Sequence, residues 1–468
     1  MSTQAEKDFL AELKIPKAPR LRIAFIHPDL GIGGAERLIV DTAVGLQSRG
    51  HKVKIYTSHH DPGHCFAETK DGTLKVFVRG DWLPRSFGGK ALILCAILRN
   101  LYLALTLMMF ESKDFDVLIV DQLSISIPIL RFSGSRILFY CHFPDKLLAK
   151  RESFLKTLYR IPFDFMEEIT TRGRMADCTV VNSNFTRQIF KDSFPSIKMN
   201  PKVLYPAIRI EAYNSEVKST KEFRRYLKGK TILLSINRFE RKKNIALAIQ
   251  AFSTLQHTCP EQFGDLVLVV AGGYDSRIAE NVQHLDELNA AASSVGLRTV
   301  VTKSLIAEEV SKAQVIFLPS FDEDHRTFLL TESLCLLYTP TNEHFGIVPV
   351  EAMYAGLPVV AANSGGPLES IVDGVTGYLR TPEPESFAEA LSILVKNPSK
   401  KLAIGKAGKQ RVLDKFTLEA FTTELEGYLE SLYMEFNWDA MWAFILVVFL
   451  APAGLLGLVW VVLLALGK

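Results

Sequence analysis

The chain has 468 residues, enough for two or three domains. Its 54 basic and 51 acidic residues nearly balance to a net charge of +3, which argues against a protein that binds nucleic acid mainly through charge. Six scattered cysteines without a CxxC pair favour a reduced, cytosol-facing protein over a disulfide framework or a zinc site. The mean hydropathy of +0.14 is high for a soluble enzyme and predicts an apolar segment outside the globular core.

A glycine loop lies near the start of the chain, between a predicted strand and a predicted helix. Residues 22–27 form an apolar run typical of a buried strand, and residues 35–49 have the period of an amphipathic helix. Gly31, Gly33 and Gly34 lie between them, and small residues there let backbone N–H groups approach a phosphate. A tight turn without a ligand is the alternative. The third glycine of the dinucleotide-binding fingerprint is missing, which makes that function the weaker interpretation.

Two histidines end predicted strands in the first half. His27 ends the first strand, and His142 ends the strand that begins at Arg136. In open α/β sheets, ligands bind beyond the carboxyl ends of parallel strands. Although a lone histidine is more often structural, this position favours a role for His142 in closing a ligand site. The strand and helix alternation restarts near residue 231, which predicts two doubly wound α/β halves with a cleft between them.

A basic loop follows the first predicted strand of the second half. Arg238 and Lys243 lie between the strand at 231–236 and the helix at 245–254. Two fixed cations beside a helix N-terminus predict a diphosphate site, and a solvated basic loop is the alternative. Residues 322–324 could be taken for a metal motif, but in an acidic loop they are better interpreted as surface charge. We therefore expect no metal.

Two carboxylates bracket the start of a short helix further along the chain. Glu343 precedes the helix, Pro349 suits its first turn, and Glu351 follows. Both carboxylates can face one cleft and bind hydroxyl groups. A nucleotide sugar fits these parts together: Arg238 and Lys243 would stabilise the leaving diphosphate, Glu351 would bind the ribose, and Glu343 would hold the sugar near the reacting carbon.

Two long apolar segments predict membrane association. Residues 91–110 could span a bilayer by length, but Arg99 lies near the middle, where a charge is costly. A helix lying on the membrane surface is therefore the preferred interpretation, with a true span or a buried domain helix as alternatives. Residues 441–466 are almost wholly apolar and predict an anchor, as one kinked span or as a hairpin.

The second-half motifs resemble a known family. Residues 343–351 resemble the E-x7-E signature of retaining glycosyltransferases of the GT-B fold, and the basic residues at 238–243 and the glycine loop at 31–34 match the same family. The resemblance implies two Rossmann-like domains that face a cleft. It also implies catalytic roles for Glu343, Lys243, Arg238 and His142, and donor contacts from Glu351 and from the residues between the carboxylates, Phe345, Gly346 and Ile347.

Four further segments, at 27–37, 60–66, 80–85 and 139–145, resemble the mannosyltransferases of lipid-linked oligosaccharide assembly. This resemblance implies GDP-mannose as the donor and a dolichol-linked oligosaccharide as the acceptor, with α1,3 and α1,6 mannose added on the cytosolic face of the endoplasmic reticulum membrane. It also implies membrane lipid and other glycosyltransferases of the pathway as partners. The alternatives are a phosphatidylinositol or other lipid glycosyltransferase with the same cleft, and a non-catalytic membrane scaffold, which the intact cation and carboxylate pairs disfavour.

These inferences together predict five parts of the chain. They are a flexible arm without a signal peptide at 1–19, a Rossmann-like acceptor domain at 20–215, a Rossmann-like nucleotide-sugar domain at 216–410, helices that cross back to the first domain at 411–437, and a membrane anchor at 438–468.

Overall fold

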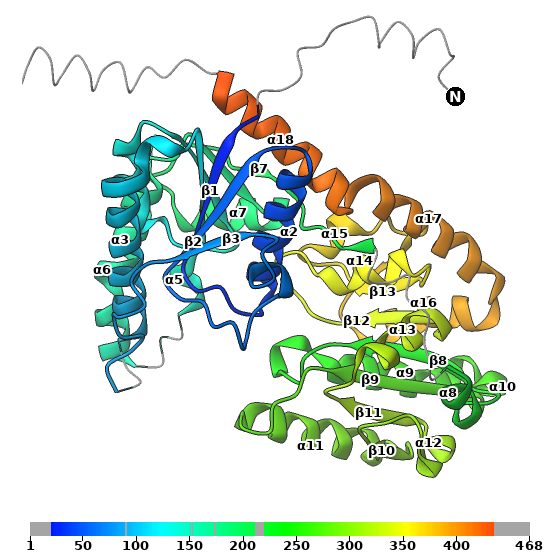
Figure 1. Ribbon diagram of the computed structural model, residues 1–468. Coiled ribbons are helices and arrows are strands. Elements are labelled where there is room, and N and C mark those ends of the chain that lie inside the picture. Colours follow the sequence, from blue (N-terminus) through cyan, green and yellow to red (C-terminus); the bar gives the residue numbers. More distant parts are fainter. Residues whose placement is uncertain are drawn as a thin grey trace, which may run out of the picture.

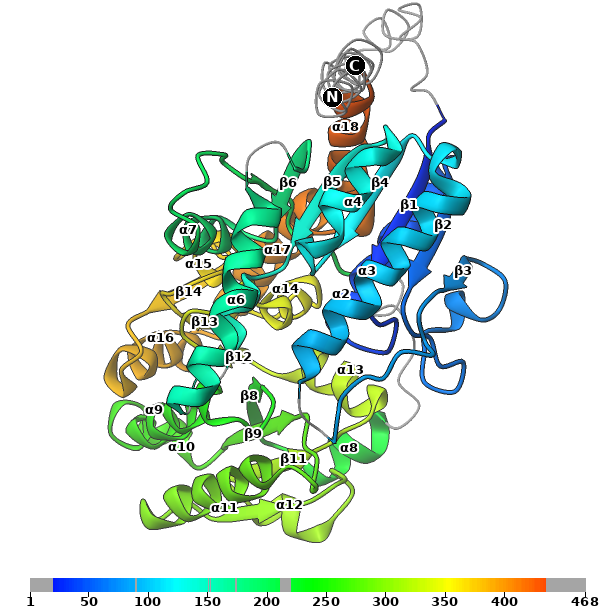
Figure 2. The same cartoon turned by 90° about the vertical axis from the view of Figure 1, so that its left-hand side faces the viewer.

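The computed structural model describes residues 20–434 except for 89–90, 150, 152, 173–174 and 211–219. It contains two seven-stranded parallel sheets, each covered by helices (Figures 1 and 2). The predicted pair of Rossmann-like α/β domains is thereby confirmed. The predicted arm at 1–19 and anchor at 438–468 lie outside the described residues.

The first sheet has the strand order β3-β2-β1-β4-β5-β6-β7, so the order reverses between β1 and β4. Ligands in open parallel sheets bind at such a switch point, beyond the carboxyl ends of the strands. The strands are β1 (Arg22–His27), β2 (Lys52–Thr57), β3 (Lys75–Val78), β4 (Val117–Asp121), β5 (Arg136–Cys141), β6 (Cys178–Val181) and β7 (Lys202–Val203).

Helices cover both faces of this sheet, which is why its central strands are continuous apolar runs. One face packs against α2 (Gly34–Ser48) and α18 (Leu418–Met434). The other face packs against α3 (Leu92–Glu111), α4 (Ile127–Leu130) and α7 (Asn184–Ser193). Two further helices, α5 (Asp145–Leu148) and α6 (Phe154–Thr171), lie on the same side of the domain as α3 (Figures 1 and 2).

The sequence did not predict α6. Pro162 interrupts the helical pattern, and many apolar side chains of α6 face outward. Ser153 begins the helix by accepting a hydrogen bond from the backbone N–H of Lys156, a common way to satisfy a free helical donor. Exposed apolar residues on α6 include Phe154 and Phe165.

Among the described residues, α3 is the one helix long and apolar enough to cross a membrane. The charged side chain near the middle of α3, however, points into the domain: Arg99 is 6% exposed and pairs with Asp81 at 2.8 Å. Its Nη2 also donates to the carbonyl of Ser58 at 2.9 Å. Leu105 and Met109 on the outer side of the helix are exposed. Helix α3 therefore combines an inward polar face with an outward apolar one, and its association with a membrane stays a prediction.

The second sheet has the order β10-β11-β9-β8-β12-β13-β14. Its strands are β8 (Thr231–Ile236), β9 (Leu266–Gly272), β10 (Thr299–Val301), β11 (Val315–Pro319), β12 (Cys335–Tyr338), β13 (Val359–Ala362) and β14 (Gly377–Arg380). The helices of this half are α8 (Thr220–Tyr226), α9 (Ile245–Thr258), α10 (Pro260–Phe263), α11 (Ala279–Ser294), α12 (Glu308–Lys312), α13 (Glu323–Glu332), α14 (Ile347–Tyr354), α15 (Pro367–Ser370), α16 (Pro384–Lys396) and α17 (Ser399–Lys415).

The acidic segment at 322–324 begins a helix, so its interpretation as a loop was wrong. The Asp322 carboxylate accepts the backbone N–H of His325 at 2.9 Å and caps α13. Acidic residues are favourable there because a helix N-terminus carries partial positive charge. The cluster thus has a structural role in starting α13.

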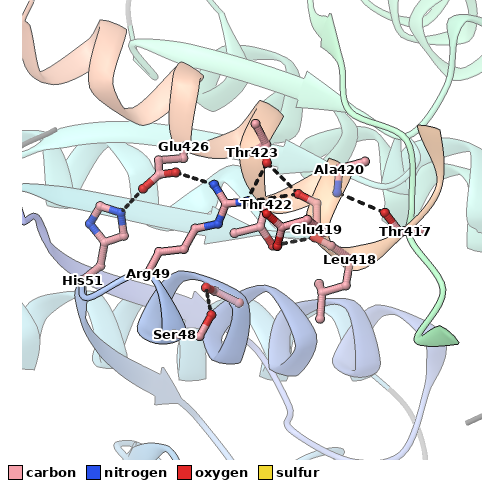
Figure 3. Close-up of polar contacts among 11 residues, drawn as sticks. Ser48, Arg49, His51, Thr417, Leu418, Glu419, Ala420, Thr422, Thr423 and Glu426 are labelled. Carbon is pink, nitrogen blue, oxygen red and sulfur yellow. Dashed lines mark hydrogen bonds and ion pairs between the residues drawn. The ribbon is translucent and has the colours of Figure 1, made fainter. Parts of the chain in front are cut away.

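The last described helix, α18, packs against the first domain. Phe421 and Leu425 join the core beneath α2. Arg49, at the end of α2, pairs with Glu426 at 2.6 Å, and His51 contacts the same carboxylate at 2.9 Å (Figure 3). Because α18 follows α17 of the second half, this contact connects the two halves.

Candidate functional site

The Glu343 loop is held in place by a glycine pair from the next turn of the second domain. The backbone N–H of Gly366 donates to the carbonyl of Glu343 at 2.8 Å. A Cβ on Gly365 would lie 2.4 Å from that carbonyl oxygen, and Gly365 also has a φ of +66°. Only glycine permits this close approach and conformation, so the turn after β13 fixes the position of Glu343.

Lys243 and Glu343 form an ion pair. The Lys243 Nζ lies 2.6 Å from Glu343 Oε2, and the two side chains are 13% and 23% exposed. The Lys243 carbonyl accepts a hydrogen bond from Thr339 at 2.8 Å, which anchors the turn that presents the ammonium. The structure thus brings together one predicted phosphate-binding cation and one predicted sugar-binding carboxylate, at the carboxyl ends of β8 and β12.

Glu351 lies deeper, within α14. Its residue is 6% exposed, and its carboxylate pairs with the guanidinium of Arg326 on α13. The buried Tyr338 is hydrogen-bonded to Glu343, and its burial and this carboxylate raise its pKa well above the ordinary value. Sequence reasoning missed Arg326 because the start of α13 was interpreted as a loop. A carboxylate held by an arginine has a fixed orientation, which suits recognition of a hydroxyl pair.

Arg238 stands apart from this pair. Its side chain is 64% exposed and lies 3.2 Å from Glu240. The turn beneath it depends on Gly272, where a Cβ would lie 1.6 Å from the carbonyl oxygen of Asn237. Arg238 therefore lies on the rim of the same loop as Lys243, where its guanidinium remains accessible to a ligand.

Of the seven residues between the two carboxylates, the three predicted to contact the donor have distinct places. Phe345 is buried, and its ring packs 5.8 Å from Tyr205 and 5.6 Å from Phe416. Any donor contact from Phe345 would therefore come from its backbone. Gly346 precedes α14 with a φ of +83°, and Ile347 begins the helix.

The first domain contributes a buried chain of charged groups that the sequence did not reveal. His27 Nδ1 lies 2.7 Å from one oxygen of Asp121, and His142 Nε2 lies 2.8 Å from the other. His27 and Asp121 are fully buried, whereas the His142 side chain is 23% exposed. His27 and Asp121 end β1 and β4, and His142 directly follows β5, so the predicted end of that strand was one residue too late; the three strands are neighbours in the sheet. The signal that could have found Asp121 is its place at the end of the apolar run that forms β4.

Electrostatic interactions favour the charged forms of His27 and Asp121. Burial lowers the pKa of His27, but the hydrogen bond to Asp121 and the nearby carboxylate of Glu36 outweigh it and raise the pKa to about 9. Burial raises the pKa of Asp121, but the charges and hydrogen bonds of His142 and His27 lower it to about 2. Asp121 is thus a carboxylate that can only accept hydrogen bonds, and it fixes the orientation of both imidazoles.

The two domains touch next to the predicted catalytic residues. The ring of Phe143, adjacent to His142, stacks on that of His344 with centroids 3.7 Å apart. The Ser183 hydroxyl donates to the carbonyl of His344. Since His344 follows Glu343 in the chain, these contacts place the two predicted catalytic elements on facing sides of one junction.

A second contact across the junction was also missed by the sequence. The Glu369 carboxylate accepts backbone N–H groups of Asn184 at 2.7 Å and Phe185 at 2.8 Å. The hydroxyl of Tyr205 donates to it at 3.0 Å. Glu369, on α15 of the second domain, thus caps the N-terminus of α7 in the first domain.

The glycine loop lies beside the histidine chain. The Glu36 carboxylate folds back over Gly33, where a Cβ would lie 2.1 Å from Glu36 Oε2. Nothing would obstruct a Cβ at Gly31 or Gly34. Within the described part of the chain, no group of three or more histidine, cysteine, aspartate or glutamate side chains could hold a metal ion.

Comparison with known proteins agrees with this geometry. The profile of "Glycosyltransferase Family 4" matches residues 32–212, and that of "Glycosyl transferases group 1" matches residues 218–411. The alpha-1,3/1,6-mannosyltransferase ALG2 of Rhizomucor pusillus is 51% identical over 417 residues, covering 87% of this chain and 91% of the relative. The human ALG2 is 47% identical over 420 residues, covering 88% and 97%. The chain belongs to this mannosyltransferase family.

Membership of the ALG2 family confirms the prediction of a glycosyltransferase that transfers mannose. Solved structures support the fold. Sucrose-phosphate synthase from Thermosynechococcus elongatus has a TM-score of 0.65 at 17% identity, covering 88% of this chain and 99% of that one. Anabaena Alr3699/HepE in complex with UDP also has a TM-score of 0.65, at 20% identity, covering 88% and 100%. At this identity the likeness shows the GT-B fold alone.

Proposed function

We propose that this enzyme transfers mannose from GDP-mannose, with retention, to a dolichol-pyrophosphate-linked Man1-GlcNAc2 acceptor. It forms the α1,3 and then the α1,6 branch of an N-glycan precursor on the cytosolic face of the endoplasmic reticulum membrane. The observation that carries this proposal is the Lys243–Glu343 pair facing the His142 element across the domain junction, in a chain of the ALG2 family.

The donor half supplies charge for the leaving group. Departure of the sugar builds negative charge on the diphosphate, and fixed cations stabilise that charge more in the transition state than in the ground state. Lys243 is held by Glu343 next to the junction, and Arg238 on the same loop provides a second accessible cation. The proposed ribose contact falls to Glu351, which Arg326 orients.

The acceptor half supplies a positioned imidazole. Because the Asp121 carboxylate only accepts, His142 donates through Nε2, which leaves Nδ1 for contact with substrate. The neighbouring Phe143–His344 stack places this imidazole beside the Glu343 loop. His142 would thus orient the sugar or the attacking hydroxyl at the junction.

A lipid-linked acceptor requires an enzyme that works at a membrane. Exposed apolar residues on the outer side of α3 and on α6, among them Met109 and Phe165, support attachment of the first domain to the bilayer. The predicted anchor at 438–468 would add a second attachment.

The test is a transfer assay with the full chain, GDP-mannose and the lipid-linked acceptor bearing one mannose. We expect two added mannoses, with one α1,3 and one α1,6 linkage. A folded protein that transfers no mannose would contradict the proposal. If phosphatidylinositol competes with the lipid-linked acceptor, the protein is better interpreted as another lipid glycosyltransferase. If the Lys243→Ala variant keeps the full biological function of the protein, a non-catalytic scaffold is favoured.

A further inference from the structure

A cavity of about 400 Å³ opens beside the glycine loop of the first domain. Its volume lies within the range of pockets that bind small ligands, which is roughly 300–1,000 Å³. Three segments form its walls: the loop after β1, the loop after β2 and the segment at 80–85. The charged or titratable side chains that line it are Asp29, Glu36, His59, Asp61, His64 and Arg85.

The lining is rich in hydrogen-bond acceptors. Three carboxylates and two imidazoles face one guanidinium, and that guanidinium, of Arg85, already pairs with Asp29. A phosphate would meet uncompensated negative charge here, whereas sugar hydroxyls donate hydrogen bonds to carboxylates. The charge pattern therefore favours a neutral ligand that carries many hydroxyl groups.

A buried nitrogen lies close to one of the residues that line this cavity. His27 is fully buried, and its Nε2 makes no hydrogen bond within the described residues. It lies 3.8 Å from the carboxylate of Glu36, which lines the cavity. Side-chain contacts thus connect Glu36 in the cavity wall, through His27 and Asp121, to His142.

The outer wall of the cavity is fixed in place by Arg99 of helix α3. Arg99 binds the carbonyl of Ser58 at 2.9 Å and the carboxylate of Asp81 at 2.8 Å. Asp81 in turn holds the ring of His59 at 2.7 Å. The carbonyl of His59 accepts the backbone N–H of Leu30 at 2.9 Å, which joins this wall to the glycine loop. A single buried guanidinium thus fixes the two outer segments of the cavity.

We propose that this cavity binds the saccharide core of the acceptor, with Asp61 and His64 as specificity-determining contacts and Arg99 as a positioning residue. The inference rests on the proposed function, because the acceptor in that reaction is a lipid-linked saccharide. It places the sugars of the acceptor, rather than its pyrophosphate, against the acidic wall, and it links that wall to the helix whose outer face is apolar.

The test compares acceptor kinetics of three variants with wild type. Asp61→Asn and His64→Ala should raise the KM for the lipid-linked acceptor about tenfold or more, with the KM for GDP-mannose unchanged. Asp71→Asn is the matched control: like Asp61, which accepts the N–H of Gly63 at 2.8 Å, Asp71 accepts the N–H of Thr73 at 2.8 Å, but it does not line the cavity. Asparagine preserves both turns.

A lipid-free saccharide acceptor with the same sugars separates the sources of binding. The acceptor KM of the cavity variants should rise by the same factor with this acceptor as with the lipid-linked one. A loss confined to the pyrophosphate-linked acceptor, or an acceptor KM equal to that of Asp71→Asn, would overturn the inference. Failure of wild type to transfer mannose at all is a different outcome and overturns the proposed function itself.

Arg99 is tested by conservative replacement. Arg99→Ala should raise the acceptor KM as strongly as the cavity variants, and Arg99→Lys should recover part of the loss, because an ammonium can still reach Asp81. If Arg99→Ala lowers Tm but leaves the acceptor KM unchanged, Arg99 is only structural and its positioning role is rejected.

Discussion

The two halves of the junction hold their charges differently. In the second domain, Lys243 and Glu343 form a partly exposed pair at the ends of two strands. In the first domain, Asp121 lies fully buried between His27 and His142. A partly exposed pair can exchange one partner for a ligand, whereas a buried chain must remain intact to stay charged. The donor half is therefore arranged for exchange with substrate, and the acceptor half for fixed orientation.

Removal of the buried charge is the most severe test of this difference between the two halves. Asp121→Asn keeps the shape but leaves a buried imidazole without its counter-charge, which costs about 3–5 kcal/mol of stability. We expect a large fall in Tm, together with a lower kcat, because His142 loses the partner that orients it. A Tm within about a degree of wild type would show that the buried groups around Asp121 are not held in their charged forms. Glu309→Gln, at an exposed site on α12, is a control for loss of one carboxylate.

Removal of the exchangeable cation should affect catalysis rather than stability. Lys243→Ala is expected to lower kcat by about 10²–10³, the usual cost of losing one group that stabilises transition-state charge. The neighbouring Lys242 pairs with Glu240 on the surface, so Lys242→Ala serves as the matched control. Equal activity of the two alanine variants would remove Lys243 from the proposed mechanism.

The buried chain also predicts how stability depends on pH. The pKa of His27 is about 9 in the folded protein against an ordinary value of 6.5, so its contribution is complete below pH 6.5 and is lost as the pH rises through 9. The pKa of Asp121, about 2, preserves its contribution down to mildly acid pH. The loss above pH 6.5 is on the order of 3 kcal/mol. Melting curves at pH 6 and pH 9.5 should show it, and Asp121→Asn should flatten the difference.

The smallest expected effect comes from a change at the junction between the two halves. Glu369→Ala removes the carboxylate that caps α7 from the other domain, at an expected cost of about 1–2 kcal/mol. We expect a modest fall in Tm and a rise in the KM for both substrates, because the junction loosens. Glu385→Ala, in the exposed first turn of α16, should change neither KM. Unchanged KM values in Glu369→Ala would limit this contact to stability.

The same contrast explains what the sequence could predict. Alternating apolar runs and helical periods identified both sheets, and one continuous motif placed Glu343 and Glu351 together. The Asp121 chain depends on the order β1-β4-β5, which spacing along the chain does not determine. The contacts of Glu369 and Arg326 likewise join residues far apart in sequence. Helix α6 was missed because Pro162 interrupts its pattern, and the start of α13 was missed because its acidic cap was interpreted as a loop.

Linkage analysis of the transfer products tests the central claim most directly. Purified full-length enzyme, GDP-mannose and the lipid-linked acceptor with one mannose should yield a product with one α1,3 and one α1,6 mannose added, both in the retained configuration. Lys243→Ala should form this product far more slowly. If the folded wild-type enzyme forms neither linkage, or forms them equally fast with Lys243 removed, the account of the junction as a mannosyl-transfer site is contradicted.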